Sequence, residues 1–131
     1  MIAVDTSAIV AILMGEADRE AIVTALNDSD RTCISAGTLI ELRVVCHRKQ
    51  AAGLAKETDA LLRTFDVETI SVSEEQAQIA FAAYARFGKG AGHPAQLNFG
   101  DLFAYALAKS RDLKLLFKGD DFAHTDIVSA L

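Results

Sequence analysis

The chain begins Met1-Ile2-Ala3-Val4-Asp5, a short apolar run that ends in a carboxylate. The run predicts a buried strand over residues 1–4, and helical and strand patterns then alternate to the end of the chain. Such alternation favours a parallel sheet that is covered by helices on both faces. We therefore expect a three-layer α/β/α sandwich, formed by one domain over residues 1–131.

The other expected elements follow from hydrophobic periodicity and from the glycines that interrupt it. Further strands are expected at residues 32–34, 67–72 and 114–117, with a weaker fifth candidate at 127–128. Helices are expected at residues 8–14, 17–27, 38–50, 54–65, 73–87 and 100–111. The central sheet is thus expected to be mainly parallel, with four or five strands.

The helix between residues 73 and 87 carries the most detailed prediction. Ser73 is expected to cap it, with Gln76 as the partner of a capping box, and Gly88 to end it. Its core face is predicted to comprise Ala77, Ala80, Phe81, Tyr84 and Phe87. Residues 88–98, which contain three glycines and the only proline, are the clearest loop.

Composition narrows the class of protein. No apolar run approaches the ~20 residues that span a bilayer, and the N-terminus lacks the basic region of a signal peptide. Cys33 and Cys46 have no motif spacing, so we interpret them as reduced, partly buried thiols. These features predict a cytoplasmic protein that makes no membrane contact.

Net charge argues against a protein that holds nucleic acid by bulk electrostatics. The formal charge is −5, which repels a phosphate backbone. Divalent cations bound at a cluster of acids would remove most of that charge. The composition therefore weakens the hypothesis of a nucleic-acid substrate but does not exclude it.

Several acids fall where a strand ends or a helix begins. Asp5 ends the first strand, Glu41 and Asp101 lie in or next to the first turns of helices, and Asp120 and Asp121 follow the fourth strand. Ligands of open α/β sheets bind beyond the carboxyl ends of the strands, and these acids could all face that edge. A cluster of carboxylates repels itself unless cations hold it, which indicates a divalent-metal site.

Each acid also has a purely structural explanation. Asp5 could cap the helix that follows it, Glu41 could form a capping box with Thr38, and Asp101 could pair with Asn98 in the same way. The two aspartates after Gly119 fit a turn. Capping explains each residue alone, but it does not explain why the acids should share one edge of one sheet.

The neighbouring polar residues are open to the same two interpretations. Thr6, Ser7 and Asn98 could cap helices, or could form polar walls of the site. The histidines have no ligand spacing and are read as surface or loop residues: His47, His93 and His124. The basic run after Glu41 most often forms a solvated face, yet it could meet a phosphate backbone: Arg43, Arg48 and Lys49.

With these positions in hand, the sequence resembles a PIN-domain protein, specifically a VapC-type toxin of a bacterial toxin–antitoxin pair. The resemblance covers essentially the whole chain, and it rests on the order and spacing of its motifs. These motifs are Ile2-Ala3-Val4-Asp5-Thr6-Ser7-Ala8, Thr38-Leu39-Ile40-Glu41, Leu97-Asn98-Phe99-Gly100-Asp101, and Leu115-Leu116-Phe117-Lys118-Gly119-Asp120-Asp121-Phe122 followed by Thr125-Asp126-Ile127.

The resemblance implies a metal-dependent endoribonuclease that hydrolyses RNA with Mg²⁺ or Mn²⁺. Asp5, Glu41 and Asp101 match the three core metal-binding acids of the family. Asp121 is the first choice for the fourth acid and Asp120 the second. The match also implies a supporting role for Ser7, and we expect supporting roles for Thr6 and Asn98.

Further partners follow from the resemblance alone. VapC-type toxins are similar in forming homodimers and in binding a small antitoxin whose C-terminal segment covers the active site. We therefore expect a homodimer and a hetero-oligomer with a VapB-like antitoxin. The hydrophobic helices at 38–50 and 54–65 could offer an apolar surface.

Two alternatives remain open at this point. One is a catalytically inactive PIN-like binding module. The other is a phosphotransferase of the haloacid-dehalogenase type, with Asp5 as its nucleophile. That reaction requires a second Asp two residues later as the general acid, and this chain has Ser7 there.

Overall fold

A computed structural model describes all residues, 1–131, and its centre is a four-stranded parallel sheet. The strands are β1 (Ile2–Val4), β2 (Thr32–Ser35), β3 (Glu68–Ile70) and β4 (Lys114–Leu116). Their order across the sheet is β3-β2-β1-β4, and every neighbouring pair is parallel. The predicted parallel sheet is confirmed.

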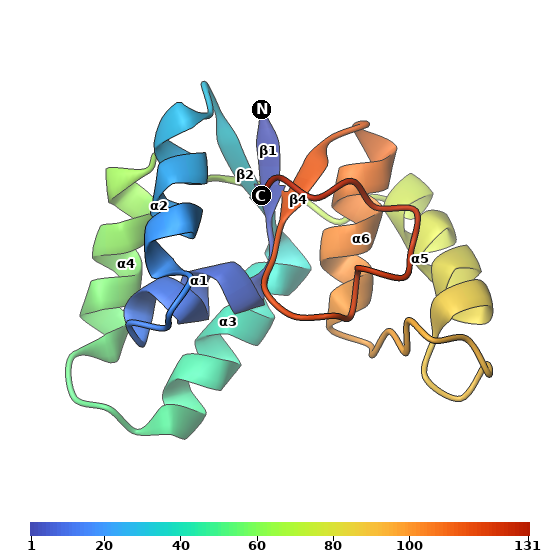
Figure 1. Ribbon diagram of the computed structural model, residues 1–131, viewed down its shortest axis with the longest axis horizontal. Helices are drawn as coiled ribbons and strands as arrows, with labels where there is room; N and C mark the ends of the chain where they lie inside the picture. The colour runs from blue at the N-terminus through green and yellow to red at the C-terminus, as the bar shows by residue number, and fades with distance from the viewer.

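Six helices surround the sheet (Figure 1). They are α1 (Thr6–Leu13), α2 (Arg19–Asp28), α3 (Ala36–Lys49), α4 (Leu54–Thr64), α5 (Glu74–Phe87) and α6 (Asp101–Ser110). In the view of Figure 1, α1, α2 and α4 lie on one side of the strands, and α5 and α6 lie on the other. None of these helices is long and apolar enough to cross a membrane.

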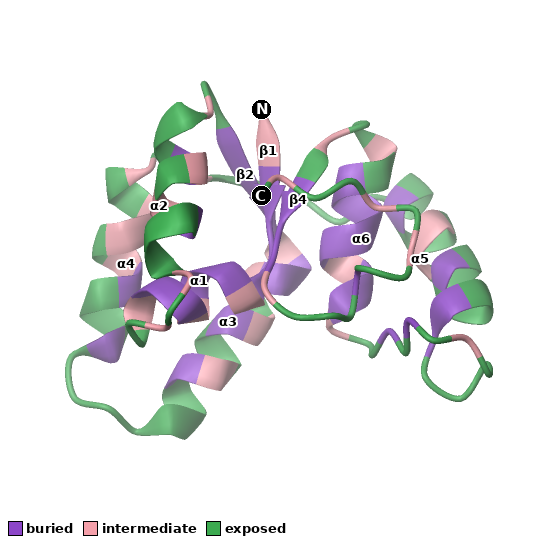
Figure 2. Cartoon of the chain, viewed as in Figure 1, coloured by how far each residue is buried: buried purple, intermediate pink, exposed green.

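Alternation along the strands divides the core between the two faces of the sheet. Ala3, Cys33 and Leu115 pack with residues of α5 and α6. The next residue in each strand turns to the other face, where residues of α1, α2, α3 and α4 cover it. Figure 2 shows β2 and α6 as largely buried, whereas two of the three residues of the edge strand β3 are exposed. The three-layer sandwich is therefore confirmed, with α6 as its most buried helix.

The fifth strand predicted at residues 127–128 does not form. The C-terminal segment makes a single parallel bridge between Ser129 and Leu115, in which the Leu115 N–H donates to the Val128 carbonyl and the Leu115 carbonyl accepts from the Ala130 N–H, both at 2.9 Å. This segment is instead anchored through Asp126, which accepts a 2.6 Å hydrogen bond from the buried Tyr105 hydroxyl and pairs with Lys109 at 3.0 Å. Burial and the Asp126 carboxylate raise the pKa of Tyr105 above its usual value.

The predicted core face of α5 is largely wrong. Phe87 is buried, but Phe81 is 74% exposed and Tyr84 is 41% exposed. Helix α5 lies outside α6 and contacts it through a stripe that contains Gln76 and Ala83. Ser73 caps α5 as predicted, by accepting from the Gln76 N–H at 3.1 Å, but the side-chain oxygen of Gln76 has no partner. The reciprocal half of the capping box is therefore absent.

The two cysteines are free, and both are buried. Cys33 lies in β2 and faces the α6 side of the sheet, whereas Cys46 lies on α3 beside Thr58. Burial raises the pKa of the Cys33 thiol above its usual value, which keeps it protonated and unreactive. The prediction of unpaired, buried thiols is confirmed.

Candidate active site

Asp5 lies at the junction where β1 passes directly into α1. Its Oδ2 accepts hydrogen bonds from the Ser7 N–H at 3.0 Å and from the Ser7 hydroxyl at 2.6 Å, so Asp5 is the N-cap of α1. The side chain is buried, yet Oδ1 has no hydrogen-bond partner. One oxygen of Asp5 therefore organises the fold, while the other is a buried acceptor that is free to bind something else.

Glu41 reaches the same region from the second turn of α3. Its Oε1 accepts a 2.6 Å hydrogen bond from the hydroxyl of Thr6, the residue after Asp5. The predicted capping box with Thr38 is wrong, because Ser35 caps α3 and the helix begins at Ala36. Strand β2 thus runs into α3 without a loop, which moves Glu41 away from the cap and toward Asp5.

Asp101 enters the region at the start of α6. Its Oδ2 accepts from the Asn98 N–H, and its own N–H donates to the Asn98 side-chain oxygen, both at 3.0 Å. This reciprocal pair confirms the predicted capping role of Asn98 and Asp101. The side chain of Asp101 is 6% exposed, so its carboxylate is held at a buried helix terminus.

Gly100 brings Glu41 and Asp101 together. A methyl group at Gly100 would collide with the carboxylate of Glu41, so only glycine permits this close approach between α3 and α6. Sequence reasoning did not single out Gly100, although its place between Asn98 and Asp101 is a usable signal. The Glu41 carboxylate can occupy its position in the site because residue 100 has no side chain.

The adjacent aspartates 120 and 121 lie in the exposed loop that follows β4. This loop is tied to α1, because the Lys118 N–H donates to the Ser7 hydroxyl at 3.0 Å. The Lys118 ammonium also pairs with Glu16 at 2.9 Å and with Asp18 at 3.2 Å. Lys118 was not predicted as part of the site, and nothing in the local sequence marks its contacts.

The electrostatics of the site connect its acids. Burial raises the pKa of Asp5 to about 6, and the charge of Glu41 adds to the effect, while the hydrogen bonds from Ser7 oppose it. Burial raises the pKa of Asp101 to about 7, and the charges of Asp5, Asp121 and Glu41 raise it further. The charges of Asp5, Glu41 and Asp121 therefore reach Asp101, and the charge of Glu41 also reaches Asp5.

These carboxylates are neighbours, but they do not form a closed cage. No three His, Cys, Asp or Glu side chains are arranged to hold a metal ion as they stand. The donor set nevertheless fits a hard divalent cation, because such ions prefer carboxylate oxygens and Asp5 offers a buried oxygen without a partner. A cation would also offset the burial of charge and the mutual repulsion that together raise both pKa values.

The histidines take no part in this cluster. His47 and His124 are exposed. His93 lies in the loop before α6, where its ring contacts Phe87 edge to face and its Nδ1 accepts from the Ala95 N–H at 3.1 Å. Their interpretation as surface or loop residues is confirmed.

Without divalent metal, the protein is expected to gain stability as the pH falls from about 7 to about 4. The pKa of Asp5 is about 6 in the folded state, against 3.8 ordinarily, so between these values the folded protein binds more protons than the unfolded chain. The shift corresponds to about 3 kcal/mol, present below the ordinary pKa and lost as the pH rises through the folded pKa. Urea denaturation in chelator across this range measures it.

Asp5→Asn is the control for this pH dependence, because it removes one of the two titrating groups and should make the profile shallower, while Asp101, whose pKa is about 7, still titrates. Asp30 and Asp126, whose pKa values are lowered, titrate below this window and do not obscure it. A free energy of unfolding that increased steadily toward pH 8 would contradict the prediction.

Comparison with known proteins is consistent with this arrangement. The PIN domain family model matches residues 2–128. Ribonuclease VapC42 of Mycobacterium tuberculosis is 43% identical over 124 residues, which cover 95% of each chain. The structure of M. tuberculosis VapC20, described as a sarcin–ricin loop cleaving toxin, superposes with a TM-score of 0.77 at 18% identity, covering 98% of this chain and 97% of that one. VapBC-5 of the same organism gives 0.65 at 25% identity, covering 98% and 93%.

Proposed function

Because the chain belongs to the PIN-domain family of VapC ribonucleases, we propose that it is the toxin of a toxin–antitoxin pair and an endoribonuclease. The observation that carries the proposal is the meeting of Asp5, Glu41 and Asp101 at one end of the sheet. These side chains come from the β1–α1 junction, α3 and α6, and no capping role requires them to meet. Hydrolysis of RNA phosphodiester bonds is the chemistry that such a cluster supports best.

We propose that Asp5, Glu41, Asp101 and Asp121 hold Mg²⁺ or Mn²⁺. A bound divalent cation would supply Lewis acidity and positive charge at the phosphate. The free Oδ1 of Asp5 makes it the most central ligand. Asp121, whose charge acts on Asp101, is preferred to Asp120 as the fourth acid.

The remaining polar residues orient these acids. Ser7 donates to Asp5 and accepts from the Lys118 N–H, so it fixes both the Asp5 carboxylate and the loop that carries Asp121. Thr6 directs Glu41, and Asn98 directs Asp101. None of these groups needs to move a proton, since each donates a hydrogen bond to an acid or holds its helix terminus.

The phosphotransferase alternative is disfavoured by the geometry around Asp5. Its mechanism needs a general acid at position 7, and Ser7 is instead committed to Asp5 and Lys118. The inactive-module alternative is disfavoured because all four acids are present and act on one another. Metal binding measured by calorimetry separates the inactive module from the enzyme.

We propose three further properties from family membership. The chain binds a VapB-like antitoxin, as VapBC-5 is described as a member of a toxin–antitoxin family, and it forms a homodimer. It works in the cytoplasm, where its two buried thiols stay reduced. Of the two helices expected to offer an apolar surface, α3 exposes Ile40 and Val44, whereas α4 exposes no large apolar side chain.

The purified protein is expected to cleave RNA when Mg²⁺ or Mn²⁺ is present and to stop in excess chelator. The physical reason is the repulsion among buried acids, which a cation must offset before a phosphate can approach. Total cellular RNA is the substrate, and sequencing of the new ends identifies the cut sites. Cleavage that persisted in chelator would exclude the metal assignment, while RNA left intact with either metal would reject the activity.

A further inference from the structure

A cavity of about 620 Å³ adjoins the acid cluster. It lies between α3, the residues that follow β3 and the start of α6. Glu41 and Gly100 form its boundary with the site, and its wall contains Ile40, Val44, Phe99 and Phe103. Whatever enters this cavity therefore lies beside the Glu41 carboxylate, at the edge of the acid cluster.

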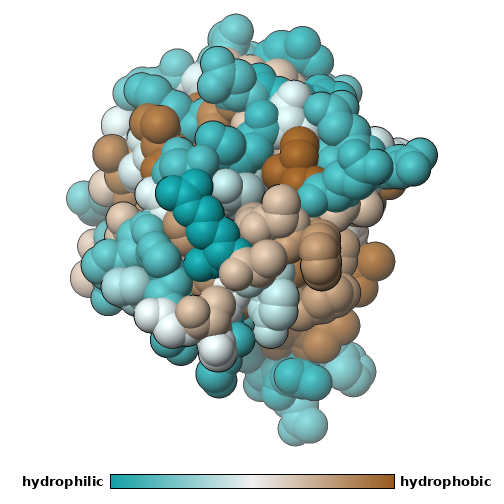
Figure 3. Space-filling view, turned by 90° about the vertical axis from the view of Figure 1, so that its right-hand side faces the viewer, coloured by the Kyte–Doolittle hydropathy of each residue, from teal (hydrophilic) through white to brown (hydrophobic).

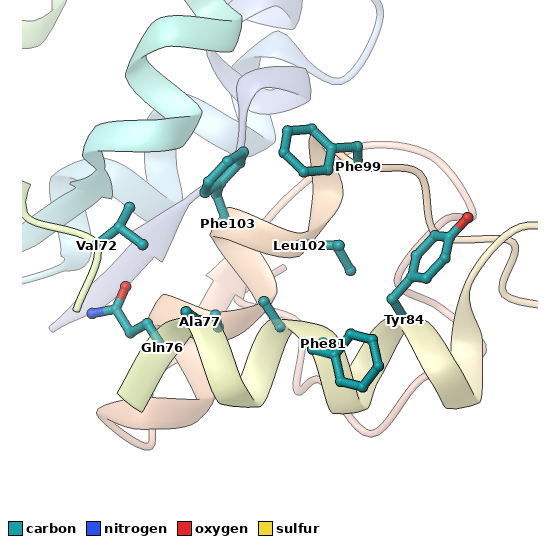
Figure 4. Close-up of a pocket in the computed structure, with 10 residues that line it drawn as sticks. Val72, Gln76, Ala77, Phe81, Tyr84, Phe99, Leu102 and Phe103 are labelled. Carbon is teal, nitrogen blue, oxygen red and sulfur yellow. The ribbon is translucent and has the colours of Figure 1, made fainter. Parts of the chain in front are cut away.

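Two aromatic rings form one wall. Phe99 and Phe103 are packed edge to face, with ring centroids 5.3 Å apart and planes at 87°. The Phe103 ring lies against Gly37 of α3, where a methyl group would collide with it. Phe103 is thus held in place by α3. Figure 4, a close-up of the neighbouring apolar cavity that both rings also line, shows Phe103 beside Phe99.

Phe99 itself is left open. It is 74% exposed, although it lies only two residues before the buried Asp101. Together with Ile40 and Val44, Phe99 forms an exposed apolar patch at the rim of a charged site, and patches of this kind mark binding surfaces. The space-filling view shows apolar residues gathered on the α5 and α6 side of the molecule amid hydrophilic ones (Figure 3).

The far end of the same cavity carries a cation. Arg48 lines it two turns along α3 from Glu41, on the same helix face. Arg43 is paired with Asp59, whereas Arg48 forms no ion pair or side-chain hydrogen bond. The cavity thus presents an aromatic ring beside the acids and a free guanidinium beyond it, a combination that complements a base and a phosphate.

We infer that this cavity is a nucleotide subsite for the RNA strand next to the scissile bond, in which a base stacks on Phe99 and a phosphate contacts Arg48. The inference rests on the proposed ribonuclease function and deepens it. Stacking is tolerant of base identity, so Phe99 acts on affinity and register rather than on sequence choice. Both residues are positioning residues, since neither is placed to touch the reacting atoms.

The test uses a short single-stranded RNA with 2-aminopurine placed at one position at a time, bound to protein made inactive by Asp5→Asn. We expect Phe99→Ala to weaken binding by about 5- to 150-fold and to abolish the fluorescence quenching at one position. Phe99→Trp should restore both. Phe81→Ala is the control that separates this cavity from its apolar neighbour, because Phe81 is equally exposed, at 74%, and lines only the neighbouring cavity, whereas Phe99 lines both.

Arg48→Gln tests the phosphate contact through salt dependence. One lost contact should reduce the slope of log Kd against log salt by about 0.7, the value for a single strand. Lys49→Gln removes the same charge from the next residue, outside the cavity, and should leave Kd largely unchanged. If the two variants weaken binding equally, Arg48 contributes only general electrostatic attraction, and its assignment as a phosphate contact in the cavity is wrong.

Other outcomes separate this inference from the proposed function. If wild-type protein cleaves RNA and Phe99→Ala binds and cleaves equally well, the subsite is wrong and the function stands. If Phe99→Ala alters the oligomeric mass while the RNA Kd is unchanged, the ring belongs to a protein interface and the subsite is again wrong. If wild-type protein neither binds nor cleaves RNA, both fail.

Discussion

Asp5→Asn is expected to abolish RNA cleavage and, at the same time, to stabilise the metal-free protein. Loss of the central carboxylate should lower kcat/KM by about 10³-fold or more, since charge stabilisation at a metal site contributes several kcal/mol. Asn is as good an N-cap as Asp, so α1 should keep its start and its hydrogen bond from Ser7.

The gain in stability comes from the burial of the Asp5 charge. Its pKa of about 6 means that ionised Asp5 opposes folding at neutral pH, and Asn removes that penalty. The free energy of unfolding at pH 7.5 should rise by up to about 3 kcal/mol in chelator. Urea denaturation measures it, and Asp112→Asn, at an exposed acid without an ion pair, is the matched control. Retained cleavage in Asp5→Asn would reject the site.

Gly100→Ala is expected to lower kcat/KM by about 100-fold while leaving the fold in place. The backbone at Gly100 is helical, with φ −63° and ψ −38°, so alanine fits it without strain. The new methyl group would displace the Glu41 carboxylate, which must then leave the Thr6 hydroxyl. A misplaced catalytic group commonly costs a factor of this size.

A double-mutant cycle isolates this mechanism. The Glu41→Gln variant already lacks the carboxylate at position 41. Adding Gly100→Ala to that variant should therefore have little further effect on kcat/KM. Circular dichroism and the urea midpoint check that α6 is intact. Full additivity of the two substitutions would show that Gly100 acts independently of Glu41, and it would contradict the steric argument.

The fold was predictable because strand and helix patterns alternate cleanly. Short apolar runs such as 1–4 and 114–117 are buried on both faces of a parallel sheet, and that requirement leaves a strong signal in the sequence. The acids were predictable for a related reason. Residues that follow parallel strands share one edge with the residues that begin the helices leading back into the sheet, so Asp5 and Asp101 could be expected to meet before any contact was known.

Other features depended on tertiary context that periodicity does not record. Helix α5 has apolar residues on more than one face, and only its position outside α6 decides that Phe87 is buried and Phe81 is not. Two caps, at Ser35 and Thr38, compete at the start of α3, and Ser35 is used because β2 enters the helix without a loop. The role of Gly100 could not be predicted from the sequence, because Gly100 acts by leaving room for the side chain of another residue, Glu41.

The direct junctions of β1 with α1 and of β2 with α3 restrict how the site can move. Asp5 and Glu41 belong to strand–helix units that have no hinge between the strand and the helix, and Asp101 begins the most buried helix. Asp121 alone lies in a loop, anchored through the Lys118 N–H. The four acids therefore differ in how far they can move when a ligand binds. Three carboxylates can adjust only by side-chain rotation, while the fourth can approach or withdraw with its backbone.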